Sequence, residues 1–365
     1  MLDPALCRGR QRRLLDVLAA RRLDAVVLSA RHHVYWLTGH WGFWLHESAA
    51  VLRADGRCTL VSGNSPNPAA AVDDARSFEA SWFATQRQEQ PRVLTKALQE
   101  VLGGARQVGT DASPAASQLV MHCSRDFHAV DDDLHQLRRR KEADELALMR
   151  RAIDCTAAMY ARAREVIEPG VEEQTVFLEL HAAAVRAAGE VLTPMHLGND
   201  FVSGPGGGPP RGGRAAAAGE VYILDLGPAY RGYFADNARA FAVDRKPTDE
   251  QLKAWGAIGG VFPIIERLAK PGTRCRDLFD AGAAHLKEHT GKTLDHHLGH
   301  GVGLQPHEFP HINPRWDDVL IEGEVFTIEP GVYGPEYGGG IRLENQYLVT
   351  RDGVENLTPF PLELA

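Results

Sequence analysis

Five acidic or imidazole side chains stand beside apolar runs, where the sequence predicts the ends of buried strands. The five residues are Asp225, Asp236, His300, Glu329 and Glu344. A carboxylate in such a place costs free energy unless it is paired or bound to a metal. Several such carboxylates together would repel one another, and two divalent cations would remove that repulsion. Oxygen ligands with one imidazole suit Mn²⁺, Co²⁺ or Zn²⁺ rather than a metal that prefers thiolates.

Each of these residues also fits an ordinary structural role when it is taken alone. Asp225 would be a turn residue after a strand, and Glu329, which precedes Pro-Gly, would be solvated. Five such residues, in segments that also contain glycines, favour one shared site. Residues 307–311 read HEFPH and match the zinc motif HExxH, but that motif needs a helix, which Pro310 would break. We therefore exclude a zinc site of that type.

Four ordered motifs carry a resemblance to a known family. They read DLG at 225–227 with GYFAD at 232–236, HGVGLQPHE at 300–308, EPGVY at 329–333 and RLE at 342–344. Together they resemble the M24-type metallopeptidase family of Xaa-Pro aminopeptidases, prolidases and creatinases. Residues 22–28, 35–39 and 138–149 are also similar to this family, so the resemblance covers nearly the whole chain. It implies an α+β fold, with a pita-bread catalytic domain and a smaller N-terminal α/β domain of the creatinase type.

The resemblance also implies a role for each motif residue. The implied ligands of two divalent ions per chain are Asp225 for one ion, His300 and Glu329 for the other, and Asp236 and Glu344 bridging both. Mn²⁺ is the ion expected first, with Co²⁺, Zn²⁺ and Fe²⁺ as alternatives. A hydroxide bridging the two ions would attack the scissile carbonyl, which the ions polarise. His307 would stabilise the oxyanion, Glu329 would carry a proton to the leaving nitrogen, and Arg342 would pair with a substrate carboxylate.

The stretch before the first predicted ligand departs from the family pattern. Peptidase members usually have a substrate-binding histidine near position 208, where this chain has Gly208 in a loop rich in glycine and proline (203–214). The candidate substrate contacts here are Arg211, Arg214 and, further upstream, His196. Because arginine binds anions through two parallel hydrogen bonds, we expect a substrate with negative charge near the scissile bond. Further departures are Ala235, Ala238 and Asn345, where the family usually has Ser, Thr and Asp.

These features predict a dinuclear metal-dependent hydrolase that resembles Xaa-Pro dipeptidases and aminopeptidases. Two alternatives stay open. The first keeps the fold and the metals but acts on another small molecule as a hydrolase or lyase, similar to creatinase, ectoine hydrolase or the sulfonium lyases. The missing histidine and the two loop arginines favour it. The second is a non-catalytic binding protein, and the complete ligand set weighs against it.

The elements that must position these residues fall into two parts, which we place at 1–135 and 136–365. In the first part, a helical pattern at 12–22 precedes an apolar run at 24–28 and a turn-centred segment at 52–61. This order predicts a small α/β domain with a mixed sheet. In the second part we expect helices at 137–166, 172–188, 250–268 and 276–289, and strands at 221–226, 237–243, 325–329 and 346–350. Helices and hairpins without regular βαβ alternation indicate an α+β domain with an antiparallel sheet.

Composition limits the partners and the compartment. The chain has 365 residues and a net charge of −8, which argues against nucleic acid as the main partner. No apolar run approaches the ~20 residues of a transmembrane helix, so we expect no membrane association. Five scattered cysteines without a CxxC pair suit the reducing cytoplasm. We also expect a homodimer, in which the aromatic segment 40–46 packs against the partner; a local core cluster is the alternative.

Overall fold

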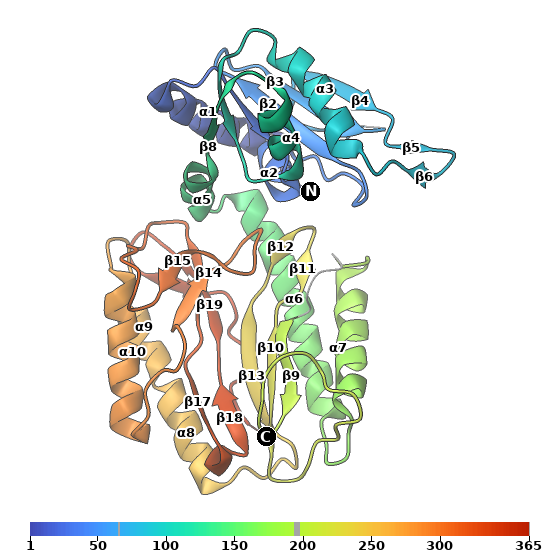
Figure 1. Cartoon of the computed structure of the whole chain (residues 1–365). Helices are drawn as coiled ribbons and strands as arrows, with labels where there is room; N and C mark the ends of the chain where they lie inside the picture. Colours follow the sequence, from blue (N-terminus) through green and yellow to red (C-terminus); the bar gives the residue numbers. More distant parts are fainter. Residues whose placement is uncertain (65, 193–197, 365) are drawn as a thin grey trace. The chain divides into compact units, whose positions relative to one another are not determined.

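The structure is a computed structural model that describes residues 1–64, 66–192 and 198–364. The chain divides into two compact units, Met1–Arg138 and Arg139–Ala365 (Figure 1). Within the described ranges, no helix combines the length and the apolar character that crossing a membrane requires.

A six-stranded sheet in the order β4-β3-β2-β1-β7-β8 forms the first unit. Because β1 runs antiparallel to β2 and parallel to β7, the predicted mixed sheet is confirmed. Its strands are β1 (Ala25–Leu28), β2 (Ser48–Arg53), β3 (Cys58–Gly63), β4 (Asp74–Phe78), β7 (Gln107–Thr110) and β8 (Asp126–Ala129), with a separate hairpin of β5 (Ser81–Trp82) and β6 (Thr85–Gln86). The helices are α1 (Pro4–Arg21), α2 (Arg31–Thr38), α3 (Gln90–Leu102), α4 (Pro114–His122) and α5 (Asp131–Arg139), the last of which reaches the boundary between the units.

Two antiparallel sheets form the second unit, in the orders β13-β10-β9 and β15-β14-β16-β19-β20. The helices are α6 (Ala143–Val166), α7 (Glu173–Ala188), α8 (Asp249–Gly259), α9 (Val261–Leu268), α10 (Cys275–Thr290) and the 3-10 helix η1 (Pro335–Tyr337). The larger sheets contain β9 (Gly198–Ser203), β10 (Val221–Leu226), β13 (Asn237–Ala242), β14 (Gly299–Gly301), β15 (Glu308–Ile312), β16 (Val325–Ile328), β19 (Asn345–Val349) and β20 (Val354–Asn356). Two short hairpins pair β11 (Ala229–Tyr230) with β12 (Tyr233–Phe234) and β17 (Gly331–Gly334) with β18 (Gly339–Arg342). This antiparallel arrangement confirms the predicted α+β class.

Helices cover the central strands of the second unit from both sides. In Figure 1, α8, α9 and α10 lie on one side of the sheets, and α6 and α7 lie on the other. Side chains along β10 alternate between the two cores: Ile223 belongs to the same core cluster as Ile258 of α8, and Leu224 to the same cluster as Leu180 of α7. Polar residues at the ends of these strands are therefore surrounded by protein.

Two helices that the sequence predicted as continuous are each interrupted. The predicted helix 137–166 is divided between α5 and α6 because Glu142 caps α6, its backbone N–H donating to the Glu145 carboxylate at 3.0 Å. The predicted helix 250–268 is divided between α8 and α9 at Gly260. A Cβ atom at Gly260 would lie 2.6 Å from Nε2 of His285, so a larger residue there would require the His285 ring of α10 to move.

Candidate metal centre

The pairing of β10 with β13 brings Asp225 and Asp236 to neighbouring strand ends, as the sequence predicted. The two strands run antiparallel with Leu226 opposite Asn237, so that Asp236 comes directly before the paired stretch. Both carboxylates are almost fully buried, with exposed fractions of 4% and 2%. The backbone N–H of Asp236 donates to the side-chain oxygen of Gln346 at 3.1 Å, which holds the chain in place next to the carboxylate.

His300 lies on β14 and is placed by glycines on either side of it. A Cβ at Gly301 would lie 1.8 Å from the carbonyl oxygen of Phe309, so only glycine permits this close approach of β14 and β15. His300 Nδ1 lies 3.0 Å from the Gly301 oxygen. Its Nε2 therefore faces the site, 3.4 Å from Glu329 Oε1 and 3.7 Å from Asp236 Oδ2. Glu329, which directly follows β16, completes this side of the site.

Glu344 enters the site between β18 and β19. Its backbone N–H donates to the Ala238 oxygen at 2.9 Å, which ties it to β13. Ligand atoms of Asp236, His300 and Glu344 lie within 4.8 Å of one another. Glu344 is 1% exposed, and its Oε2 atom has no hydrogen-bond partner among the described residues. A buried, unsatisfied carboxylate oxygen beside a second carboxylate and an imidazole fits a divalent cation.

The pKa values of the site residues also fit a site for a divalent cation. Burial raises the pKa of Asp225, and burial together with carboxylate repulsion raises the pKa of Asp236 and of Glu344 well above the usual range. Burial disfavours charge on His300, but the hydrogen bond and charge of Glu329 outweigh it and raise the His300 pKa to about 9. The same ion pair lowers the pKa of Glu329 to about 2 despite its burial. The metal-free site therefore holds protons that a cation would displace.

Arg342, at the end of β18, bonds to two carboxylates. Its Nη2 donates to Asp225 Oδ2 at 2.7 Å and also to Asp200 Oδ2. Its Nη1 donates to the hydroxyl of Tyr333 at 3.1 Å. Only 10% of the Arg342 side chain is exposed. A contact between Arg342 and a substrate carboxylate stays a prediction, since the contacts in the structure are with the protein's own acidic groups.

Two further histidines stack beside His300. The ring of His307 is nearly parallel to that of His300, with centroids 3.7 Å apart, and His297 stacks at 5.2 Å. His297 Nε2 lies 3.3 Å from Glu329 Oε1. Although part of His307 stays exposed, loss of solvent on its packed side and repulsion from His300 lower its pKa to about 4. His307 is therefore neutral near pH 7 and can donate one N–H to a group outside the protein.

The two loop arginines make contacts within the loop and at its base. Glu173, whose side chain is completely buried, accepts hydrogen bonds from Arg211 Nη2 at 2.6 Å and from the Ser203 backbone N–H at 2.8 Å. Arg214 forms an ion pair with Glu220. Substrate binding by these arginines stays a prediction. His196, the third candidate substrate contact, lies outside the described residues.

Sequence reasoning overlooked three residues of this site: Asp200, His297 and Tyr333. For His297, the available signal was the closely spaced histidines in HHLGH at 296–300. For Tyr333, it was the EPGVY motif itself. Asp200 had only the weak signal of an acidic residue beside the apolar pair at 201–202, because its partner Arg342 is distant in sequence.

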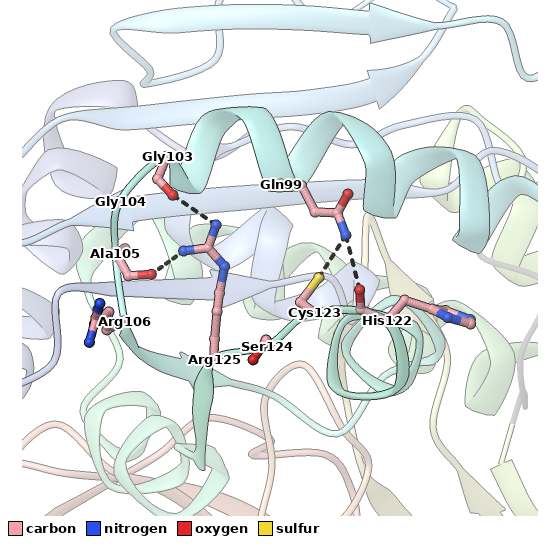
Figure 2. Close-up of a pocket in the computed structure, with 9 residues that line it drawn as sticks. All are labelled: Gln99, Gly103, Gly104, Ala105, Arg106, His122, Cys123, Ser124 and Arg125. Carbon is pink, nitrogen blue, oxygen red and sulfur yellow. Dashed lines mark hydrogen bonds between the residues drawn. The ribbon is translucent and has the colours of Figure 1, made fainter.

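A pocket in the first unit is separate from these residues (Figure 2). It lies where α3 and α4 end. Arg125 donates to the carbonyl oxygens of Gly103 and Ala105, and Gln99 donates to Sγ of Cys123 at 2.9 Å. These polar groups bond to one another, and none of the predicted site residues lines the pocket.

Comparisons with known proteins agree with this description. The model of metallopeptidase family M24 matches residues 147–351, and that of the creatinase/prolidase N-terminal domain matches residues 10–140. The chain is 27% identical to the Xaa-Pro dipeptidase of Pyrococcus horikoshii, over 97% of each chain. It is 30% identical to the probable dipeptidase PepE of Mycobacterium bovis, over 72% of this chain and 71% of that relative. The solved Xaa-Pro dipeptidase from Bacillus anthracis has a TM-score of 0.83 at 22% identity and covers 98% of this chain and 99% of its own, which shows a shared fold.

Proposed function

The chain belongs to metallopeptidase family M24, and on this premise we propose that it is a hydrolase that cleaves Xaa-Pro peptides with the help of two divalent metal ions. The family itself implies divalent metal ions. The observation that carries the proposal is the convergence of Asp236, His300 and Glu344 within 4.8 Å, with an unsatisfied carboxylate oxygen among them. A site that binds only an organic molecule gains nothing from such a cluster of buried carboxylates.

The proposed ligands are Asp225, Asp236, His300, Glu329 and Glu344, with Mn²⁺ as the expected ion. When bound, such ions polarise the scissile carbonyl and make water more acidic. The carboxylates of Asp236 and Glu344 provide the charge that holds both ions. The contact between His300 Nδ1 and the Gly301 oxygen supports the proposal, because it keeps His300 Nε2 directed at the site.

Two side chains are proposed to act on the substrate. His307 donates an N–H to the oxygen on which negative charge develops, which its neutral form and partial exposure permit. Glu329 accepts a proton from the attacking water and passes it to the leaving proline nitrogen. Oε1 of Glu329 lies next to both His297 and His300, so its other oxygen is the one proposed to carry the proton.

The names of the relatives support a peptide as the substrate, because the relatives given above are dipeptidases. The alternative reaction on a non-peptide small molecule is not favoured.

We further propose that residues 136–365 carry out catalysis and that residues 1–135 mediate homodimerisation. Exposed fractions of 53% for Phe43 and 67% for Trp44 support such an interface. The five cysteines, all in the described part of the chain, form no disulfide, which supports a reducing compartment such as the cytoplasm.

Turnover by the metal-loaded protein tests the proposal. Protein stripped with a chelator and reloaded with Mn²⁺ should hydrolyse Xaa-Pro dipeptides and short Xaa-Pro peptides, and should leave matched Xaa-Ala peptides and cyclic amidines intact. The Asp236→Asn variant, which keeps the shape of the side chain, should be inactive. Turnover of an amidine without turnover of any Xaa-Pro peptide would show the proposed substrate class to be wrong.

A further inference from the structure

We propose that Asp200 is a positioning residue that links the glycine-proline loop (203–214) to the metal centre through Arg342. The proposal rests on the proposed function in one respect, namely that Asp225 is a metal ligand. Asp200 does not belong to any of the motifs that carry the family resemblance.

The register of the sheet places Asp200 beside the centre. Asp200 lies opposite Asp225 where β9 pairs with β10, and the register shifts directly after this pair. The two strands come very close here, because a Cβ at Gly198 would lie 1.9 Å from the Asp225 carbonyl oxygen. The side chain of Asp200 is 14% exposed, so its charge is only partly solvated.

The two oxygens of Asp200 bond to different parts of the protein. Oδ2 accepts from Arg342 Nη2, the same nitrogen that donates to Asp225 Oδ2 at 2.7 Å. A buried guanidinium held between two carboxylates has little freedom to rotate. Because Arg342 engages one oxygen of Asp225, it determines which way that carboxylate turns. Asp200 therefore acts on Asp225 through Arg342.

The other oxygen of Asp200 holds the middle of the loop. Oδ1 accepts from the backbone N–H of Gly208, and the Gly208 oxygen accepts from the backbone N–H of Phe201 at 3.0 Å. Gly208 has φ +101°, which favours glycine. A Cβ at Gly207 would lie 3.0 Å from Asp200 Oδ1, so a side chain there would press on the bond. The loop and the centre thus share one carboxylate.

Two variants separate the two contacts. Asp200→Asn keeps a side-chain oxygen that can accept the hydrogen bond from the Gly208 backbone N–H. It removes the negative charge that pairs with the Arg342 guanidinium. Asp200→Ala loses both contacts. We expect Asp200→Asn to weaken Mn²⁺ binding by about 10–100-fold, in the range of partners that orient metal ligands. In the Asp200→Asn variant, the backbone amides of residues 204–210 should exchange hydrogen at the wild-type rate. Asp200→Ala should weaken Mn²⁺ binding to a similar extent and should also speed exchange within residues 204–210.

Equilibrium dialysis with Mn²⁺ alone, followed by elemental analysis, measures binding independently of activity. Turnover at saturating Mn²⁺ adds a second readout: Asp200→Asn should lower kcat while KM stays near the wild-type value. The matched control is Glu220→Gln, which removes the carboxylate that pairs with Arg214 of the same loop but leaves Arg342 untouched. The control should bind Mn²⁺ like the wild type.

The outcomes separate this proposal from the proposed function. If the wild type binds two ions and Asp200→Asn binds them equally well, Asp200 has no positioning role, although the proposed function stands. Equal losses in Asp200→Asn and Glu220→Gln would also overturn the role, because general charge loss would explain both. A wild type that binds no Mn²⁺ would overturn both proposals. The near-isosteric Asn variant keeps the test informative if the Ala variant fails to fold.

Discussion

His300 Nε2 lies 3.4 Å from Glu329 Oε1, and this buried pair changes the pKa of both partners in opposite directions. Despite burial, the pair raises the His300 pKa to about 9 and lowers the Glu329 pKa to about 2. Because a metal ligand must be deprotonated, binding of an ion at His300 must release a proton near neutral pH. Metal affinity and proton binding are thus coupled at this position.

Metal content should follow the proposed ligand set. Wild-type protein loaded with Mn²⁺ should contain two ions per chain by elemental analysis. Asp236→Ala or Glu344→Ala should lose both ions or nearly so, because each removes a ligand proposed to bridge the two ions, whereas His300→Ala should chiefly empty one site. Asp280→Ala, which removes an exposed carboxylate on α10, is the control and should keep both ions. Absence of Mn²⁺ from the loaded wild type would refute the dinuclear centre.

The stability of the metal-free protein should fall as the pH rises from roughly 7 to 9. The stabilisation from His300 is complete below its ordinary pKa of 6.5 and is lost as the pH passes about 9. The raised pKa values of Asp236 and Glu344 act in the same direction, because a carboxyl that holds its proton more tightly in the native state than in the unfolded chain loses this stabilisation as the pH rises. Glu329 adds no slope here, because its contribution is lost only in acid, toward about pH 2.

Melting temperatures measured with a chelator and with saturating Mn²⁺ test this pH dependence. Mn²⁺ should flatten the curve, because it keeps the ligands deprotonated at every pH in the range. A chelated sample whose melting temperature does not change with pH would contradict the raised pKa values.

His307→Ala should lower kcat by about 10²–10³-fold, as expected for loss of a hydrogen-bond donor to an oxyanion. The metal content should stay at the wild-type value. His289→Ala removes an exposed histidine on α10 and should leave kcat unchanged. If His307→Ala loses metal together with activity, His307 is a metal ligand and the oxyanion role is wrong.

Arg211→Ala should destabilise the fold by about 1–3 kcal/mol, because the buried Glu173 carboxylate loses its charged partner. Arg214→Ala should cost less than about 1 kcal/mol, since the Arg214–Glu220 pair is partly exposed. Urea unfolding measures both. Wild-type stability of Arg211→Ala together with a raised KM and an unchanged kcat would contradict this structural role and support the predicted substrate contact, because that pattern marks lost ground-state binding.

The oligomeric state tests the proposed interface. Wild-type protein should have the mass of a dimer by light scattering at micromolar concentration. A Phe43→Ser and Trp44→Ser double variant should shift toward the monomer, because large exposed aromatics contribute strongly to interfaces. Trp316→Ser changes a 47% exposed aromatic of the second unit and should leave the mass unchanged. A monomeric wild type would remove the proposal.

Local sequence patterns were sufficient to identify the family, the α+β class and the candidate ligands. This was possible because each acidic candidate stands in a short motif next to an apolar strand, and His300 stands between two glycines in its own motif. The same local logic excluded the HExxH reading, and residues 308–312 indeed form strand β15 rather than a helix. The break between α8 and α9 at Gly260 was missed because a glycine inside a helical pattern is tolerated and does not by itself end a helix.

Which charged side chains face one another depends on how distant segments of the chain pack together. Arg342 bonds to Asp200 and Asp225, which precede it by 142 and 117 residues, and Arg211 bonds to Glu173 across 38 residues. No local pattern selects such partners, because a guanidinium binds any carboxylate that the fold brings within reach. Strand register and the close approach of strands at glycines determine which carboxylates lie near each guanidinium. The acidic and basic residue types were visible in the sequence, whereas their pairing depended on packing over the whole unit.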